Sequence, residues 1–147
     1  MTLSLNTSME MHDAFVLELT TAADGTGFVL FHGCVYRSTG EPGRDAGTSG
    51  WQNVRMTFTG MTFEGLACEH KSYVSDGSLS VNGTLEDGMI AFPAEHSGTI
   101  CLSMTVSDDF SVRNIRATSA VIHCEGEFEP EADGTMREII TRLSDRR

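Results

Sequence analysis

The alternation of apolar and polar residues along most of the chain predicts β-strands. Apolar residues recur at every second position in segments 15–20, 51–59 and 99–106, which is typical of strands with one buried face. Segment 28–36 is apolar on both faces, so we expect a central strand there. The same pattern continues in segments 66–73, 89–92 and 112–128. The chain is therefore expected to form about seven to nine strands.

Asp-Gly and Asn-Gly pairs mark the turns between these segments, because such pairs favour tight hairpins. They occur at 24–25, 76–77, 82–83 and 87–88. The longest interruption is segment 38–50, which is rich in glycine and serine and has no apolar residue larger than Ala46 before Trp51. Little burial offsets the entropy of ordering such a segment, so we expect it to be the most mobile internal loop.

Only the C-terminus departs from strand periodicity. Its apolar residues follow the spacing of an amphipathic helix, with one apolar side along Met136, Ile139, Ile140 and Leu143. Asp133 or Thr135 can cap the start of this helix, and the final arginines lie at its negative end. The spacing therefore predicts a helix over residues 133–146.

These elements predict one domain over residues 1–147, with residues 1–11 as a flexible N-terminal segment. The expected fold is mainly β: an antiparallel β-sandwich or open barrel with one C-terminal amphipathic helix. The helix is expected to pack on the sheet or on a second copy of the chain, which would make a homo-oligomer.

The charge of the chain restricts the kinds of partner. Lysine and arginine number 10 and aspartate and glutamate 21, which gives a formal net charge of −11. Phosphate backbones and anionic membranes repel such a surface, so we expect neither nucleic acid nor membrane as a partner. A basic protein or a cation fits the charge better.

The cysteines and the N-terminus indicate a cytoplasmic protein. Cys34, Cys68, Cys101 and Cys124 are widely spaced and form no C-x-x-C pair. The first residues have neither a basic region nor a continuous apolar run, so we expect no secretory signal. No apolar segment has the roughly 18 residues that span a bilayer. Reduced thiols in a cytoplasmic domain are the simplest interpretation.

Five acidic residues at every second position form the clearest functional pattern. In an extended chain, side chains two apart share a face at roughly 6.6–6.8 Å. The residues are Glu125, Glu127, Glu129, Glu131 and Asp133. Pro130 lies among them and cannot donate to a sheet, so we expect an edge strand or an exit from the fold. The pattern predicts an acidic binding surface, a protected sheet edge or, less directly, a divalent-cation site.

No motif identifies a reaction, and we expect no cofactor, metal or catalytic residue. The glycine-rich segment 38–50 lacks the lysine of a P-loop, and the calcium-loop and nucleophile-elbow motifs are absent. Cys68 and His70 with His123 or Cys124 have the wrong spacing for structural zinc. His12 and Asp13 are neighbours, and in an extended chain their side chains point to opposite faces.

A pocket assembled from scattered polar residues is the alternative to a charged surface. Its candidate residues are His12, Asp13, His32, Tyr36 and His123. Such a pocket would make the protein a small-ligand-binding or enzymatic β-barrel. Strand aromatics such as Trp51 and Tyr73 could also line a sugar-binding face, although they are more often core residues.

The first part of the chain resembles small, uncharacterised bacterial β-rich proteins. Those proteins open with His-Asp-Ala before an alternating strand and later carry a V-x-x-x-F-x-G strand. The residues that carry the resemblance are His12, Asp13, Ala14, Val16, Leu17, Leu19, Val54, Phe58 and Gly60. Some such proteins are similar to immunity proteins of bacterial toxin systems, so the resemblance implies an antiparallel β fold and an inhibitor role. The leading hypothesis is a small non-enzymatic protein that binds a basic partner protein through its acidic surface.

Overall fold

The computed structural model describes residues 5–67, 72–107 and 109–135. In these ranges the protein is all β, with 79% of the residues in strands, all of which pair antiparallel. The strands are β1 (Asn6–Thr21), β2 (Gly27–Ser38), β3 (Gly47–Thr59), β4 (Thr62–Glu64), β5 (Ser72–Val81), β6 (Thr84–Asp87), β7 (Met89–Phe92), β8 (Ala94–Val106) and β9 (Ser111–Thr135). The predictions of an antiparallel β fold and of a single domain are confirmed.

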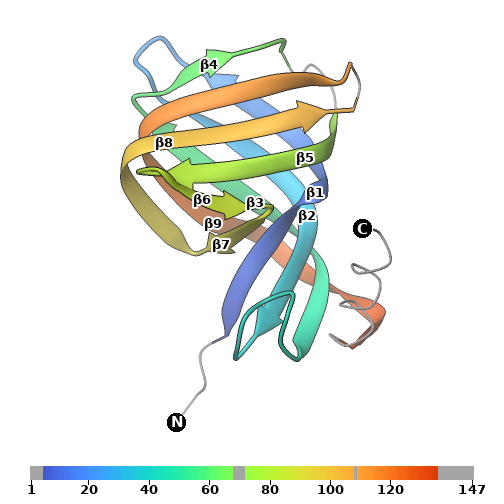
Figure 1. Ribbon diagram of the computed structural model, residues 1–147. Coiled ribbons are helices and arrows are strands. Elements are labelled where there is room, and N and C mark those ends of the chain that lie inside the picture. Colours follow the sequence, from blue (N-terminus) through green and yellow to red (C-terminus); the bar gives the residue numbers. More distant parts are fainter. Residues whose placement is uncertain (1–4, 68–71, 108, 136–147) are drawn as a thin grey trace.

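Six of the strands form a closed ring in the order β5, β8, β9, β3, β2 and β1 (Figure 1). The ring closes because β1 also pairs with β5, through Phe15 opposite Tyr73 and Val16 opposite Ser72. The short strand β4 adds to β9, β6 adds to β5, and β7 adds to the first half of β1. The architecture is therefore one continuous sheet that curls on itself.

Apolar side chains fill the inside of the ring. Alternate residues of each strand point inward, as the sequence pattern predicts. The interior side chains include Met9, Met11, Val29, Phe31, Val54, Met56, Phe58, Leu79, Leu102, Ile115 and Ile122. Gly33 is needed in this packing because a Cβ atom there would lie 2.8 Å from the side chain of Met9. The ring thus encloses a packed core.

β1 changes its neighbour part of the way along its length. Its pairing with β2 is interrupted between Glu10 and Phe15, where β1 has more residues than the facing part of β2. Asp13 lies in this bulge with φ of 70°, a backbone conformation that aspartate tolerates better than most residues. Before the bulge β1 pairs with β7, and after it with β5. The bulge therefore lets one strand both close the ring and extend past it.

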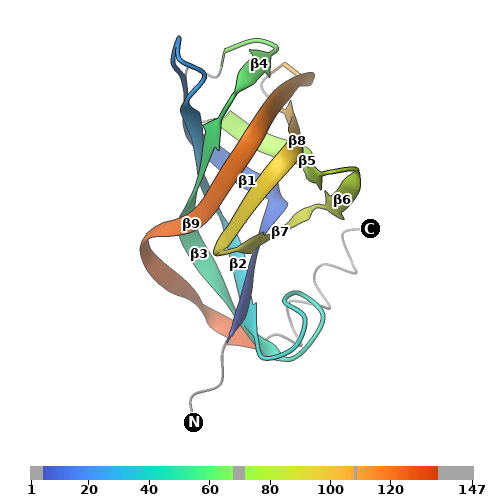
Figure 2. The ribbon, with the colours of Figure 1, turned by 90° about the vertical axis from the view of Figure 1, so that its left-hand side faces the viewer.

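β9 is the longest strand and also continues past the ring (Figure 2). It pairs with β8 only as far as Ile122, whereas its pairing with β3 continues to Thr135. In the described part of the chain, the segment after Ile122 therefore has one unpaired edge. The prediction that Pro130 lies on an edge is confirmed for these residues.

Three predicted boundaries differ from the structure. The loop expected over 38–50 spans only residues 39–46, because β2 and β3 continue as a hairpin through its two ends. The N-terminal segment 1–11 was expected outside the fold, yet β1 begins at Asn6 and buries Met9 and Met11. The strand β9 includes residues 133–135, where the helix was expected to start, and residues 136–146 of that prediction lie outside the described residues.

Candidate functional site

The acidic segment of β9 is a bulged strand rather than a straight ladder. Glu125 faces Asn53 and Glu129 faces Trp51, so four steps along β9 match only two along β3. Gly126 has φ of 84° at this point, a conformation that glycine adopts without strain. The bulge changes the direction of the chain between Glu125 and Glu129. The carboxylates are therefore not evenly spaced along a straight strand, although Glu125 and Glu129 lie opposite residues on the same face of β3.

The acidic residues have different surroundings. Glu125 forms an ion pair with Arg55, whose Nε and Nη2 donate over 2.5 and 3.2 Å. These bonds lower the pKa of Glu125 and raise that of Arg55. Glu127 and Glu129 are exposed, and Glu131 is half-buried. The side chain of Asp133 lies outside the described residues, so the described exposed carboxylates of this segment are Glu125, which pairs with Arg55, and Glu127 and Glu129.

An aromatic residue anchors this segment to the fold. Phe128 lies between the two exposed glutamates and packs against the core. The guanidinium of Arg37 on β2 lies 3.8 Å from the centre of the Phe128 ring. Gly50 permits the close approach of β9, because a Cβ atom there would lie 2.7 Å from the Phe128 ring. Glu127 and Glu129 are thus held on either side of a fixed residue.

A pocket of about 250 Å³ lies beside this anchor, where the strands extend past the ring. At this end the chain crosses from β1 to β9 between β7 and β8. Phe92 at the end of β7 pairs with Thr7 of β1, and Ala94 at the start of β8 pairs with Ile122 of β9. The side chains that line the pocket come from five strands and two adjoining residues. They are Leu5, Thr7, Arg37, Gln52, Phe92, Pro93, His123 and Cys124.

Gln52 is the buried polar residue of this pocket. Its side chain is only 4% exposed, and its Nε2 donates to the carbonyl of Gly126 over 3.1 Å. Because a carbonyl only accepts, this bond fixes the orientation of the amide. The remaining atom, Oε1, is buried and has no hydrogen-bond partner among the described residues. Such an acceptor is rare in folded proteins and is available to a donor from a ligand or water.

The alternative pocket residues do not converge. His123 lines the pocket, but His32 and Tyr36 lie on the opposite face of β2 from the interior residues Phe31 and Val35. His32 Nδ1 lies 2.8 Å from Asn53 Oδ1, and the ring stacks on Trp51. Tyr36 donates to Glu10 over 2.8 Å. Burial raises the pKa of Tyr36, and Cys34 and Glu10 raise it further.

His12 and Asp13 do come together, contrary to the expectation for an extended chain. The His12 Nδ1 and Asp13 Oδ1 atoms are 3.3 Å apart. The positive φ of Asp13 in the β1 bulge turns its side chain toward its neighbour. The pair is partly exposed and is absent from the residues that line the pocket, so His12 and Asp13 are separate from the pocket candidates.

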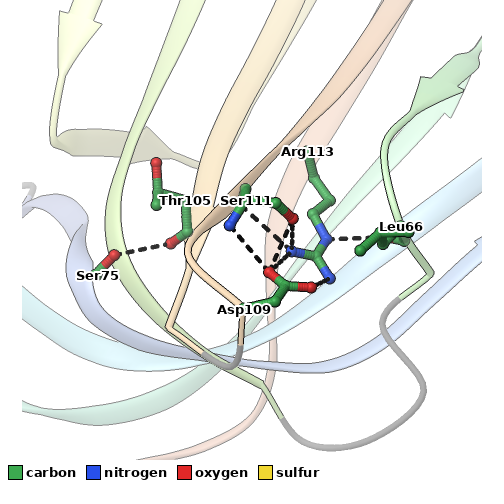
Figure 3. A network of polar contacts seen from close by, with 6 residues as sticks. All are labelled: Leu66, Ser75, Thr105, Asp109, Ser111 and Arg113. Carbon is green, nitrogen blue, oxygen red and sulfur yellow. Dashed lines mark hydrogen bonds and ion pairs between the residues drawn. The ribbon is translucent and has the colours of Figure 1, made fainter.

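A second polar network lies at the turn between β8 and β9 (Figure 3). Arg113 is buried, and its two terminal nitrogens donate to the two carboxylate oxygens of Asp109 over 2.6 and 2.9 Å. Its Nε donates to the carbonyl of Leu66 over 2.9 Å. Ser111 completes the network as a donor to Asp109 and an acceptor from Arg113. These partners satisfy the guanidinium, so we assign the network a structural role.

Comparison with known protein families, curated proteins and solved structures found no match to this chain. Among the described residues, no group of three or more histidine, cysteine, aspartate and glutamate side chains is arranged to hold a metal ion. The same residues contain no helix with the length and hydropathy that crossing a membrane requires. The resemblance to immunity proteins therefore stays a prediction.

Sequence reasoning missed most of the pocket. Gln52 and Arg37 lie on strands with ordinary alternation, and nothing in the sequence marks one amide or one arginine as part of a site. The one available signal was the glycine at position 126 in a run of acidic residues. A glycine inside a strand indicates a bulge, and this bulge directs the Gly126 carbonyl toward Gln52.

Proposed function

We propose that this protein binds a basic partner protein through the exposed carboxylates of β9. The observation that carries the proposal is the display of Glu127 and Glu129 on either side of Phe128, which is anchored by Arg37. Because Phe128 holds the backbone between them, this segment does not have to be ordered when a partner binds, and the carboxylates steer a basic surface toward the site. The net charge of −11 extends the same attraction over the whole surface.

The resemblance of the N-terminal segment supports one form of this function. An immunity protein neutralises a toxin by binding it, and an acidic inhibitor suits a basic toxin. In this form the protein is a non-enzymatic cytoplasmic inhibitor, and its specificity depends on β9 rather than on His12 and Asp13.

The proposal predicts that affinity for a basic partner depends more on the charges of Glu127 and Glu129 than on the net charge. The test is the affinity for a labelled Lys/Arg-rich peptide, measured by fluorescence anisotropy over a salt titration. With E127Q/E129Q we expect affinity to fall about fivefold, from roughly 0.5 kcal/mol for each exposed ion pair lost. The salt dependence should also weaken, because fewer charges contribute to attraction.

A matched control removes the same charge elsewhere. Glu64 on β4 and Glu95 on β8 are both exposed, and E64Q/E95Q lowers the net negative charge by the same amount. We expect this variant to bind within about twofold of the unmodified protein, because its β9 carboxylates are intact. Equal affinities for the two double variants at every salt concentration would rule out β9 as the binding surface.

A further inference from the structure

The pocket at the end of the ring combines a cation, a buried acceptor and apolar walls. The cation is Arg37, the acceptor is Gln52 Oε1, and the walls include Phe92 and Pro93. Its volume of about 250 Å³ corresponds to about eight water molecules at roughly 30 Å³ each. A ligand of that size is smaller than most drug-sized molecules.

Arg37 is positioned to bind an anion. Its guanidinium carbon lies over the Phe128 ring at 3.8 Å from the ring centre, and an arginine that packs on a ring can still use its N–H groups as a fork. Among the described residues, no carboxylate forms an ion pair with Arg37. A guanidinium fork matches the two oxygens of a carboxylate. The geometry therefore favours a planar acid group at this end of the pocket.

Gln52 requires a donor. Because its Nε2 is bound to the Gly126 carbonyl, its Oε1 can be satisfied only by an N–H or O–H group that the described residues do not supply. The apolar side chains of Leu5, Phe92 and Pro93 also line the pocket and suit an apolar body between the two polar ends.

We propose that this pocket binds a small organic carboxylate that carries an apolar body and a hydrogen-bond donor. The carboxylate pairs with Arg37, the donor bonds to Gln52 Oε1, and the body contacts Phe92 and Pro93. The ligand contacts in this site are made by residues other than Glu127 and Glu129, although Arg37 also packs on Phe128 between them.

Cys124 provides a direct readout of occupancy. Its exposed thiol lines the pocket, so a bound ligand should slow its alkylation by iodoacetamide. The probes are 4-hydroxybenzoate, benzoate, which lacks the donor, and 4-hydroxybenzamide, which lacks the charge. Alkylation is measured by mass spectrometry of the peptide that contains Cys124, with the Cys101 peptide as an internal reference.

We expect 4-hydroxybenzoate to protect Cys124 at concentrations about tenfold lower than either of the other probes, since each lacks one charged or buried polar contact. R37Q should remove the advantage of 4-hydroxybenzoate over 4-hydroxybenzamide, and Q52M should remove its advantage over benzoate. R44Q removes the same charge from a residue whose side chain is 79% exposed and does not line the pocket, and it should change neither ratio.

Two outcomes would overturn the proposal. Equal protection by all three probes would show that neither Arg37 nor Gln52 selects the ligand. Absence of protection by any probe at about 10 mM would show that the pocket does not take a small carboxylate, because a site with a Kd of about 0.1 mM would be about 99% occupied at that concentration. If Q52M fails to fold, as judged by circular dichroism, the comparison of R37Q with R44Q still decides whether the charge is used.

Discussion

Arg113 illustrates how individual residues make a buried charge acceptable in this protein. The guanidinium is almost fully buried, yet each of its three nitrogens has an oxygen partner (Figure 3). The network joins the turn before β9 to the segment after β4, because its acceptors are Asp109 and the carbonyl of Leu66. An arginine so bound holds two loops at fixed positions.

The Arg113–Asp109 pair makes stability depend on pH. Hydrogen bonds from Arg113, and then from Ser111, lower the pKa of Asp109. A carboxylate with a lowered pKa stabilises the fold above its unfolded pKa of about 3.9, and this contribution is lost as pH falls below that value. D109N should therefore be less stable than the unmodified protein near neutral pH, and the difference should shrink as pH falls from about 5 to about 3.

Urea denaturation of both proteins across this range measures the difference in free energy of unfolding. Titration of the other carboxylates cancels in the comparison, because both proteins contain them. A difference that stays constant down to about pH 3 would mean that the charge of Asp109 does not contribute to stability.

At the scale of strands, the bulges decide which side chains meet. The sequence alternation identified most strands correctly, because apolar residues at every second position are typical of strands with one buried face. It did not reveal the bulges in β1 and β9, because a bulge changes the register of pairing, and only Gly126 in β9 marks one in the sequence. Met11 and Ala14 are both buried although they are three positions apart, which strict alternation does not allow.

The same limit of sequence alternation explains why only part of the candidate site was predicted. The sequence indicated that Glu127 and Glu129 are exposed acids on an edge, because charge and Pro130 mark such a strand. It did not indicate that Gln52, Arg37 and Cys124 share a pocket, because they come from three strands whose order in the ring depends on long-range pairing. The expected meeting of His32, Tyr36 and His123 failed because His32 and Tyr36 lie on the opposite face of β2 from its interior residues.

The β1 bulge should be sensitive to the residue at position 13. A left-handed backbone conformation costs most side chains about 1–2 kcal/mol, and β-branched residues tolerate it least. D13V should therefore lower the free energy of unfolding by about 1–2 kcal/mol more than D13N, which also loses the carboxylate but tolerates positive φ. Urea denaturation measures both variants, and equal losses would show that the backbone of Asp13 is not strained.

At the scale of the whole molecule, negative charge and the edge of β9 act together. An unpaired strand edge can bind the edge of another molecule, and charged side chains prevent such contact. E127Q/E129Q should therefore aggregate faster than E64Q/E95Q at equal concentration, even though both have the same net charge. Light scattering over time measures this difference, and equal rates would mean that net charge alone keeps the protein dispersed.

The closure of the ring has a consequence for how copies of the chain can associate. Among the described residues, two pairs join β1 to β5, whereas β1 pairs with β2 along most of its length. Of the described pairings that close the ring, this seam is the shortest, so opening the ring there breaks the fewest of them. An opened copy presents the same two edges that a second opened copy presents, so each can close on the other by exchanging strands. If two copies exchanged strands in this way, the joint that closes the ring within one chain would become the joint between two chains.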